Sequence, residues 1–545
     1  MCSAMSGVRV QTTTLALLAS LTLVTSVVSQ PVQAELPRER VDTDTIRTVG
    51  RTIHVPPGAD LQAAINSARL GDEITLQPGA TYRGPIVLPK KDGTGWLVLR
   101  TSETDAALLA GGGIRVHPGR ARLMPKLVAS TGSVITLAPG AHNYRLIGLE
   151  LAPNAGAFLY NLVAPSVEPR SEADQPHHLI VDRCYLHGDA TRGTRRAIAL
   201  NGRYIAVIHS YLSDFKEAGA DSQALAGWNG SGPFKILDNY LEGGAENVMF
   251  GGADSAIAGL VPSDIEILGN TFSKNPRWYS GNTGYDGSRW TMKNLLELKN
   301  ARRVLLEANV FENFHGFAIV ITPRNQSGGA PWSTVEDVTI RHNWMRQVSS
   351  LLNVSGFDEY HQSQPTRRIT VEHNVAENIY DKGEPNPKMI LINQGPDDVT
   401  IRHNTVLTPP GLGSTYLAFA NANTKKGNSF VFADNIFGVG TYGLFAENPG
   451  LGTGPATFLA GHFRAWTFAG NVLINPQGAP THIYPSGQRW VSAVDDVGFR
   501  DPMKKDFALA AKSRYRGVAT DRGDPGANVE VVRETFKRFM SIPGP

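Results

Sequence analysis

The chain has 545 residues, a formal net charge of +3 and no long basic run, which argues against a nucleic-acid-binding protein and is compatible with an acidic polymer as partner. It holds two cysteines, and Cys2 falls within a predicted leader, so the mature protein keeps Cys184 alone. This excludes an intramolecular disulfide and a cysteine metal cluster. The 56 glycines and 34 prolines indicate many turns.

Residues 1–34 are typical of a secretory signal peptide. An apolar run over residues 15–28, broken by Ser and Thr, precedes Val32-Gln33-Ala34, which fits the small-x-small cleavage rule. Cleavage after Ala34 leaves a secreted or periplasmic chain that begins at Glu35. The alternative is an uncleaved N-terminal anchor, because the leader is poor in charge. No other apolar run is long enough to span a bilayer.

The pattern after the leader predicts an amphipathic helix from Leu61 to Arg69, then a Gly-Asp turn and a strand. A repeat follows, of which "HLIVDRCYL", "PFKILDNYL" and "DVTIRHNTV" are examples. Apolar residues alternate with period two and lead to one fixed position, which recurs every 26 to 39 residues. The residues at this position are Cys184, Ser210, Asn239, Asn270, Asn309, Asn343, Asn374, Asn404, Asn435 and Asn471.

A second strand is predicted within each repeat, in segments such as "AIALN", "LLELKN" and "MILINQ". Two or three short strands per repeat with no helix between them exclude a stack of β-α-β units, and the irregular loop lengths argue against a propeller. The remaining architecture is an all-β, right-handed parallel β-helix of about 11 to 12 coils. The asparagine column is predicted to be structural, because its amides can hydrogen-bond to the coils above and below.

On these repeats the chain resembles the right-handed β-helix proteins of the pectate-lyase-like superfamily. "DLQAAINSARLGDEITLQPGATYRG" looks like their capping helix and first coil, and "FRDPMKKDFALAAKSRYRGVATDRGDPGANV" looks like their closing coil. The organisation that this implies is a signal peptide (1–34), an N-terminal segment with a capping helix (35–75), the β-helix (76–495) and a C-terminal closing segment (496–545).

The strand Leu295–Lys299 carries two charges, Glu297 and Lys299, on the face opposite Leu296 and Leu298. Arg324 follows one repeat later, in "TPRN". Because stacked coils lie about 4.8 Å apart, these groups are expected in one patch.

Asn247 is expected to extend this face on the preceding coil, and Glu246 to join it if the bend at "GGA" resets the alternation. The alternative for the patch is a surface Glu-Lys pair among solvated neighbours.

The longest repeat contains a loop rich in aromatic and basic residues, "NPRWYSGNTGYDGSRW". Aromatic rings beside arginines suit sugar stacking and carboxylate pairing. The alternative is a loop that only covers a hydrophobic flank. The predicted substrate contacts are His315, Trp278, Tyr279, Trp290, Arg289 and Asn325. A row of His342, His373 and His403 is interpreted as a solvated turn row rather than a metal ladder.

Removing the C5 proton of a uronic acid requires neutralisation of its carboxylate, a base, and an acid for the departing oxygen. Lys299 and Arg324 suit the base and the acid, and carboxylate and amide oxygens from Glu246, Asn247 and Glu297 suit Ca²⁺. "ELKNARR" and "TPRNQ" resemble the site of chondroitinase-B-type and alginate-lyase-type members of the superfamily, which implies the same roles and the same ion.

The sequence therefore predicts a secreted, monomeric polysaccharide lyase that cleaves a uronic-acid polymer by β-elimination. The alternatives are a glycoside hydrolase or uronate C5-epimerase on the same scaffold, and a non-catalytic glycan-binding β-helix protein of the cell envelope.

Overall fold

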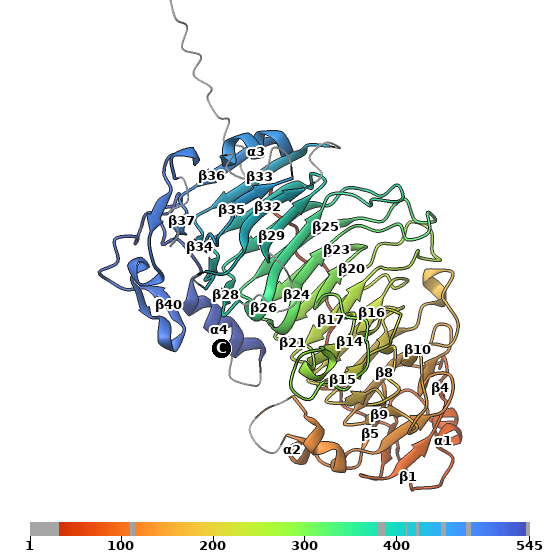
Figure 1. Ribbon diagram of the computed structural model, residues 1–545. Helices are drawn as coiled ribbons and strands as arrows, with labels where there is room; N and C mark the ends of the chain where they lie inside the picture. Colours follow the sequence, from red (N-terminus) through yellow and green to blue (C-terminus); the bar gives the residue numbers. More distant parts are fainter. Residues whose placement is uncertain are drawn as a thin grey trace, which may run out of the picture.

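The computed structural model describes residues 32–109, 113, 115–379, 387–409, 411–420, 425–447, 454–475 and 481–540. Most of the predicted signal peptide, residues 1–31, lies outside the described residues. The described chain forms one long solenoid of stacked parallel strands, running from β1 at one end to β37 and β38 at the other (Figure 1). The predicted right-handed parallel β-helix is confirmed.

The first face of the solenoid is one sheet of 14 parallel strands. In spatial order its strands are β1 (Thr52–Val55), β2 (Glu73–Leu76), β5 (Leu97–Thr101), β8 (His142–Ile147), β11 (His177–Asp182), β14 (Arg203–Ile208), β17 (Phe234–Leu237), β20 (Ser263–Leu268), β23 (Ala301–Glu307), β25 (Val335–Arg341), β27 (Arg367–Glu372), β30 (Asp397–Arg402), β33 (Gly427–Ala433) and β36 (Phe463–Ala469).

The second face follows the fixed column of the repeat. Its strands are β3 (Thr81–Arg83), β6 (Lys126–Ala129), β9 (Glu150–Pro153), β12 (Tyr185–His187), β15 (Tyr211–Phe215), β18 (Tyr240–Gly243), β21 (Thr271–Ser273), β24 (Val310–Ile321), β26 (Trp344–Ser355), β28 (Val375–Glu377), β31 (Thr405–Val406), β34 (Ile436–Gly438), β37 (Val472–Ile474) and β38 (Arg489–Val491).

The third face corresponds to the second strand of each repeat. Its own strands are β4 (Ile86–Leu88), β7 (Ile135–Leu137), β10 (Asn161–Pro165), β13 (Arg196–Ala199), β16 (Gln223–Gly227), β19 (Glu246–Phe250), β22 (Leu296–Leu298), β29 (Lys388–Asn393), β32 (Thr415–Ala420) and β35 (Gly443–Ala446). The 12-residue strands β24 and β26 run through both the second and third faces.

The asparagine column forms a continuous hydrogen-bonded ladder inside the solenoid. Asn309, for example, accepts from the backbone N–H of Asn270 at 2.9 Å and donates to Asn343 Oδ1 at 3.0 Å. Cys184 occupies the same column, fully buried, and its Sγ lies 3.5 Å from Leu146 O. Burial raises the pKa of this thiol to about 12, so it is inert as a nucleophile at neutral pH. The column is structural, as predicted.

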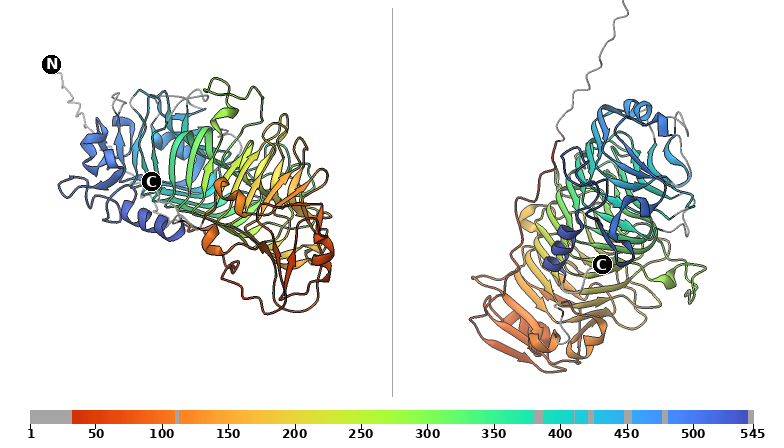
Figure 2. Two further views of the ribbon diagram at one scale, coloured as in Figure 1. Left: turned by 90° about the horizontal axis from the view of Figure 1, so that it is seen from below. Right: turned by 90° about the vertical axis from the view of Figure 1, so that its left-hand side faces the viewer.

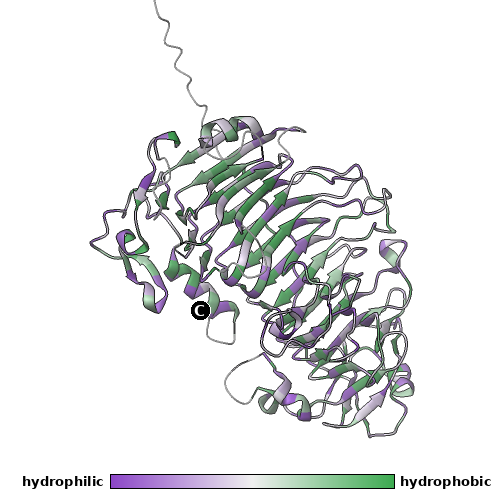
Figure 3. Cartoon of the chain, in the orientation of Figure 1, coloured by the Kyte–Doolittle hydropathy of each residue, from purple (hydrophilic) through white to green (hydrophobic). Residues whose placement is uncertain are grey.

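Hydrophobic residues follow the strands and hydrophilic ones gather in the loops (Figure 3). Leu146, Ile267, Leu296 and Ile340 belong to one core cluster that extends along the solenoid. Burial of each such side chain stabilises the fold by about 1.5–3 kcal/mol. The packed core therefore supplies the stability that disulfides supply in other secreted proteins.

Four helices lie around the strands in the described part of the chain: α1 (Leu61–Ser67), α2 (Asp105–Leu108), α3 (Pro455–His462) and α4 (Val529–Phe539). The predicted helix forms as α1, two residues shorter than expected; it buries Leu61 and Ile65 beside β1 (Figure 1). The antiparallel strands β39 (Phe499–Asp501) and β40 (Asp506–Leu509) precede α4.

Helix α4 packs Val532 and Phe536 in one cluster with Val310 and Trp344, on the outside of the second face. None of the helices in the described ranges is both long and apolar enough to cross a bilayer.

Candidate functional site

The register of the third face brings the predicted charges onto one outer surface. Glu297 pairs with Met249 on the preceding coil and with Val320 on the next, as the alternation predicts. Its neighbours Leu296 and Leu298 are fully buried in the core. The β-strand period of two therefore places Glu297, and Lys299 after it, away from the core.

Glu297, the middle residue of β22, is the centre of a small polar group. The Nζ atom of Lys299 lies 3.4 Å from Glu297 Oε2, and Asn294 Nδ2 donates to the same oxygen at 3.3 Å. The side chains of Lys299 and Glu297 are only 12% and 9% exposed. The pair is thus held in a recess, which contradicts the alternative of a solvated surface pair.

Arg324 is connected to this group by a backbone hydrogen bond, and its side chain is held by the carboxylate of Asp358. Its N–H donates to the carbonyl of Lys299 at 2.8 Å, which ties the two residues together across adjacent coils. Its Nη1 donates to Asp358 Oδ1 at 2.8 Å, and its guanidinium lies 5.1 Å from the centre of the Tyr360 ring. The Asp358 side chain is fully buried, so it holds Arg324 in one orientation.

A pocket of about 670 Å³ contains this group. Lys299, Arg324 and Glu297 line it together with Lys293, Tyr279 and His315. The rings of Tyr279 and His315 stack with centroids 4.1 Å apart, so the long loop and β24 supply one aromatic wall. Two of the six predicted substrate contacts, Tyr279 and His315, therefore lie beside Lys299 and Arg324.

The pocket carries an excess of positive charge. Among the described residues that line it, Lys293, Lys299 and Arg324 are cationic and Glu297 is the one carboxylate. Lys293 Nζ pairs with Asp221 at 2.6 Å. Since a lysine has three donors and an arginine five, each cation keeps donors for an anionic ligand besides its own partner. Lys293 was not among the predicted site residues, because it lies at the end of an irregular loop, outside the strand whose alternation predicted Glu297 and Lys299.

The other predicted contacts lie elsewhere. Trp278 is buried. The Lys216 ammonium lies over both tryptophan rings, 5.0 Å from the centre of Trp278 and 5.2 Å from the centre of Trp290. Arg289 is exposed outside the pocket. Asn325 is 1% exposed, and its side chain holds its own loop by bonding Gln362 O and Ala330 N. None of these four residues lines the pocket.

The three predicted calcium ligands do not converge. Gln223 and Val248 fix the register of β19, so Glu246 and Asn247 point to opposite faces of the strand. Glu246 is fully buried and accepts from Gln223 Nε2 at 2.7 Å. It lies on the side of Glu297 and Lys299, as a bend at "GGA" would allow, but it is buried and does not line the pocket. Because Asn247 is turned into the solenoid, away from the other two donors, the set does not fit the predicted ion.

Asn247, which was predicted to extend the outer face, is fully buried and points inwards, because its counterparts on the adjacent coils, Ala224 and Leu295, belong to the core cluster. Its Nδ2 donates to Leu241 O at 2.6 Å and to Ser273 O at 2.8 Å. The amide thus ties β19 to β18 and β21.

A buried charge cluster that the sequence did not reveal lies beneath the pocket. Lys274 is fully buried and donates to the carbonyls of Gly243, Gly244 and Ala245 at 2.8, 2.5 and 3.0 Å. Burial lowers the pKa of Lys274 to about 7 and, with the nearby Glu297 and Asp221, raises that of Glu246 to about 8. The cluster fixes the turn that leads into β19.

The histidine row is less exposed than predicted. His373 stacks on His403 with centroids 5.1 Å apart, and His403 is 5% exposed. The Nε2 atom of His403 lies 3.0 Å from Asp521 Oδ2 and 3.9 Å from Asp434 Oδ2. The C-terminal segment that carries Asp521 therefore covers a row that the sequence analysis took to be solvated.

No protein-family model matches the sequence, and no curated protein matches it. Among solved structures, a mannuronic acid specific polysaccharide family 6 lyase from human gut microbiota aligns over 90% of this chain and 99% of its own, with 13% identity and a TM-score of 0.48. The family 6 alginate lyase AlyGC aligns over 87% and 58%, with 12% identity and a TM-score of 0.44. The pectate lyase Pel9A aligns over 65% and 77%, with 14% identity and a TM-score of 0.32.

Similarity at these levels carries no argument about family or activity. The parallel β-helix rests on the stacked parallel strands of the three faces themselves.

Proposed function

We propose that the protein is a polysaccharide lyase that cleaves a uronic-acid-containing polymer by β-elimination. The observation that carries the proposal is that Lys299 and Arg324, from two adjacent coils, line the same pocket. The hydrogen bond from the backbone N–H of Arg324 to the carbonyl of Lys299 holds the two residues next to each other. The positive lining supports an acidic substrate, and the Tyr279–His315 wall supports a sugar ring.

In the proposed reaction Lys299 first gives its ammonium proton to solvent, and the free amine then takes the proton from C5 of the uronate. The electron pair of the broken C5–H bond forms the C4–C5 double bond, and the C4–O bond breaks. Arg324 and Lys293 bind the uronate carboxylate, which stabilises the negative charge that develops beside C5. The departing oxygen takes a proton from water, so the products are a new chain end and an unsaturated uronate.

Of the two enzymatic alternatives, hydrolysis has less support. Glycoside hydrolases use a pair of carboxylates on either side of the bond. Of the described residues that line the pocket, Glu297 alone is an acid, and Lys299 pairs with it. An epimerase shares the proton abstraction and differs in returning a proton to C5 instead of breaking the C4–O bond.

The test is ultraviolet absorbance of unsaturated products on a panel of alginate, pectate and glycosaminoglycans. The wild type should give rising absorbance on at least one polymer. Lys299→Ala should lower the rate by about 10²- to 10⁴-fold, since it removes the base. Lys235→Ala is the matched control, because Lys235 pairs with Glu266 on the first face. Reducing ends without absorbance, or equal rates for both variants, would refute the proposal.

A further inference from the structure

An extended segment of the mature N-terminus runs along the outside of the first face (Figure 2). Residues 35–46, here called the strap, are bonded to a succession of strands. Arg38 N–H donates to Asp264 Oδ1 on β20 at 2.8 Å, and Asp44 O accepts from Arg145 on β8 at 2.6 Å. The strap therefore runs against the order of the coils, from the middle of the solenoid back towards β1.

The strap also contributes apolar anchors to a face that would otherwise meet water. Pro37 and Val41 are buried. Val41 packs in one small cluster with Ile180 and Ile208 on the outer side of β11 and β14. Seating the strap thus completes the surface of the first face.

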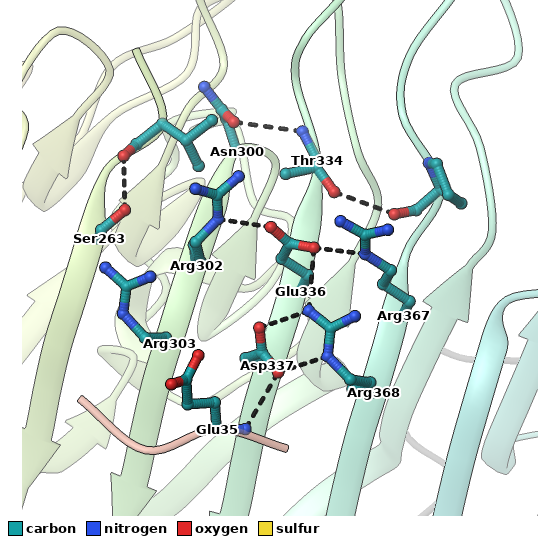
Figure 4. A network of polar contacts seen from close by, with 12 residues as sticks. Glu35, Ser263, Asn300, Arg302, Arg303, Thr334, Glu336, Asp337, Arg367 and Arg368 are labelled. Atoms are coloured by element: carbon teal, nitrogen blue, oxygen red, sulfur yellow. Dashed lines mark hydrogen bonds and ion pairs between the residues drawn. The ribbon is translucent and has the colours of Figure 1, made fainter. Parts of the chain in front are cut away.

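The N-terminal end of the strap, at Glu35, contacts a buried carboxylate. The backbone nitrogen of Glu35 donates to Asp337 Oδ1 on β25 at 3.0 Å (Figure 4). Asp337 is 2% exposed, and Arg368 binds both of its oxygens at 2.6 Å. Burial alone would raise the pKa of Asp337, but the bonds from Arg368 and from the Glu35 amide hold it below its ordinary value. Asp337 is therefore an anion placed at the nitrogen of Glu35.

This nitrogen is the one that the predicted cleavage would release, because the small-x-small rule places the cut between Ala34 and Glu35. We propose that Ala34–Glu35 is the processing site and that the α-ammonium created there forms an ion pair with Asp337 that fastens the strap. Hydrolysis breaks the peptide bond, adds hydroxyl to the carbonyl carbon of Ala34 and leaves hydrogen on the nitrogen of Glu35. At neutral pH that nitrogen then takes a further proton from water and bears a full positive charge.

Processing thereby adds a full positive charge to the donor of a hydrogen bond whose acceptor is already an anion. The bond becomes an ion pair, which strengthens it. The arginines in Figure 4 reduce this gain without cancelling it, since Arg302 and Arg367 are bound to Glu336 and Arg303 to Asp264. Glu336 and Asp264 offset part of this positive charge, and Asp337 is the acid that lies against the Glu35 nitrogen.

The first experiment determines the terminus. The full sequence is expressed in a secretion-competent bacterial host, and the exported protein is analysed by intact mass and N-terminal sequencing. We expect a chain that begins at Glu35. A different mature terminus overturns the proposal.

The second experiment measures opening of the strap by native-state hydrogen exchange of peptides covering residues 38–46. A chain that begins at Glu35 is compared with one that begins at Gln33 and with the Glu35 chain after Nα-acetylation. We expect about five- to tenfold slower exchange when the free ammonium is at Glu35. Acetylation changes no residue, so its result does not depend on whether a variant folds.

Asp337→Asn and Asp264→Asn separate the ion pair from general support of the strap. The two acids are matched, since each binds one arginine and one strap amide, but Asp264 faces the internal amide of Arg38. In Asp264→Asn the chain with a free ammonium at Glu35 should still exchange more slowly than the other two forms. In Asp337→Asn this difference in exchange rate should vanish. Equal exchange for all three termini in the wild type, or the same advantage in both variants, overturns the proposal.

Discussion

The asparagine ladder gives a sharp test of the fold, through the substitution Asn309→Ala. The Oδ1 atom of Asn309 accepts from Asn270 N at 2.9 Å and from Asn270 Nδ2 at 3.1 Å. Its Nδ2 donates to Ile267 O at 2.8 Å and to Asn343 Oδ1 at 3.0 Å. Alanine removes all of these bonds from the middle of the solenoid, where water does not reach.

The expected cost follows from which partners lose their bonds. The N–H of Asn270 becomes a buried donor without an acceptor, which costs about 1–3 kcal/mol. The carbonyl of Ile267 loses one donor and the two side-chain amides lose one bond each, at about 0.5–1.5 kcal/mol for each bond. We therefore expect Asn309→Ala to lower the free energy of unfolding by about 3–5 kcal/mol.

Ser210→Ala is the matched control, because Ser210 stands in the same column with fewer bonds. Its Oγ accepts from Cys184 N at 3.0 Å and donates to Ile208 O at 2.8 Å. Its removal should cost about half as much as that of Asn309. Urea denaturation gives the two midpoints, and hydrogen exchange of the peptide around Asn270 shows whether the loss begins at the ladder. If Asn309→Ala costs no more than Ser210→Ala, the ladder does not hold the coils together as described.

Three further predictions concern the surroundings of the pocket. Asp358→Asn should lower kcat about tenfold with an unchanged circular dichroism spectrum, because Arg324 loses the charge that orients it; an unchanged kcat contradicts this role. Lys274→Met should lower the free energy of unfolding by about 2–4 kcal/mol in urea denaturation, because it leaves three carbonyls without their donor; a neutral result would show that these bonds are dispensable. Glu246 has its pKa raised to about 8 by burial, from an ordinary 4.5, so the folded protein holds a proton that the unfolded chain releases. Its contribution to stability is complete below pH 4.5 and is lost as pH rises through about 8. Glu246→Gln should remove this decline, by up to about 1.4 kcal/mol per pH unit, when unfolding is followed against pH; parallel curves for variant and wild type would contradict the assignment.

The fold was largely readable from the sequence because each coil repeats the same local pattern. The asparagine column marks the bend before every strand of the second face from β18 to β37, and the alternation fixes which side chains of β22 face outwards. The same alternation placed Glu297 correctly, since a regular strand needs only its register to be known.

The site was only partly readable, because its remaining parts depend on contacts between distant segments. Asp358 and Tyr360 come from a loop beyond the next coil, and Lys293 comes from the end of an irregular loop. Nothing in the period of the strands shows which rings of that loop turn inwards, so Trp278 and Tyr279 were treated alike although only Tyr279 lines the pocket.

The central claim, that Lys299 removes the C5 proton of a uronate, is tested most directly by reaction in D₂O with NMR detection of the sugar signals. With a polymer that the wild type accepts, the account predicts loss of the C5 proton together with the C4 vinyl signal of an unsaturated product, and neither change with Lys299→Ala. Chain cleavage by the wild type with the C5 proton retained in every product would contradict it.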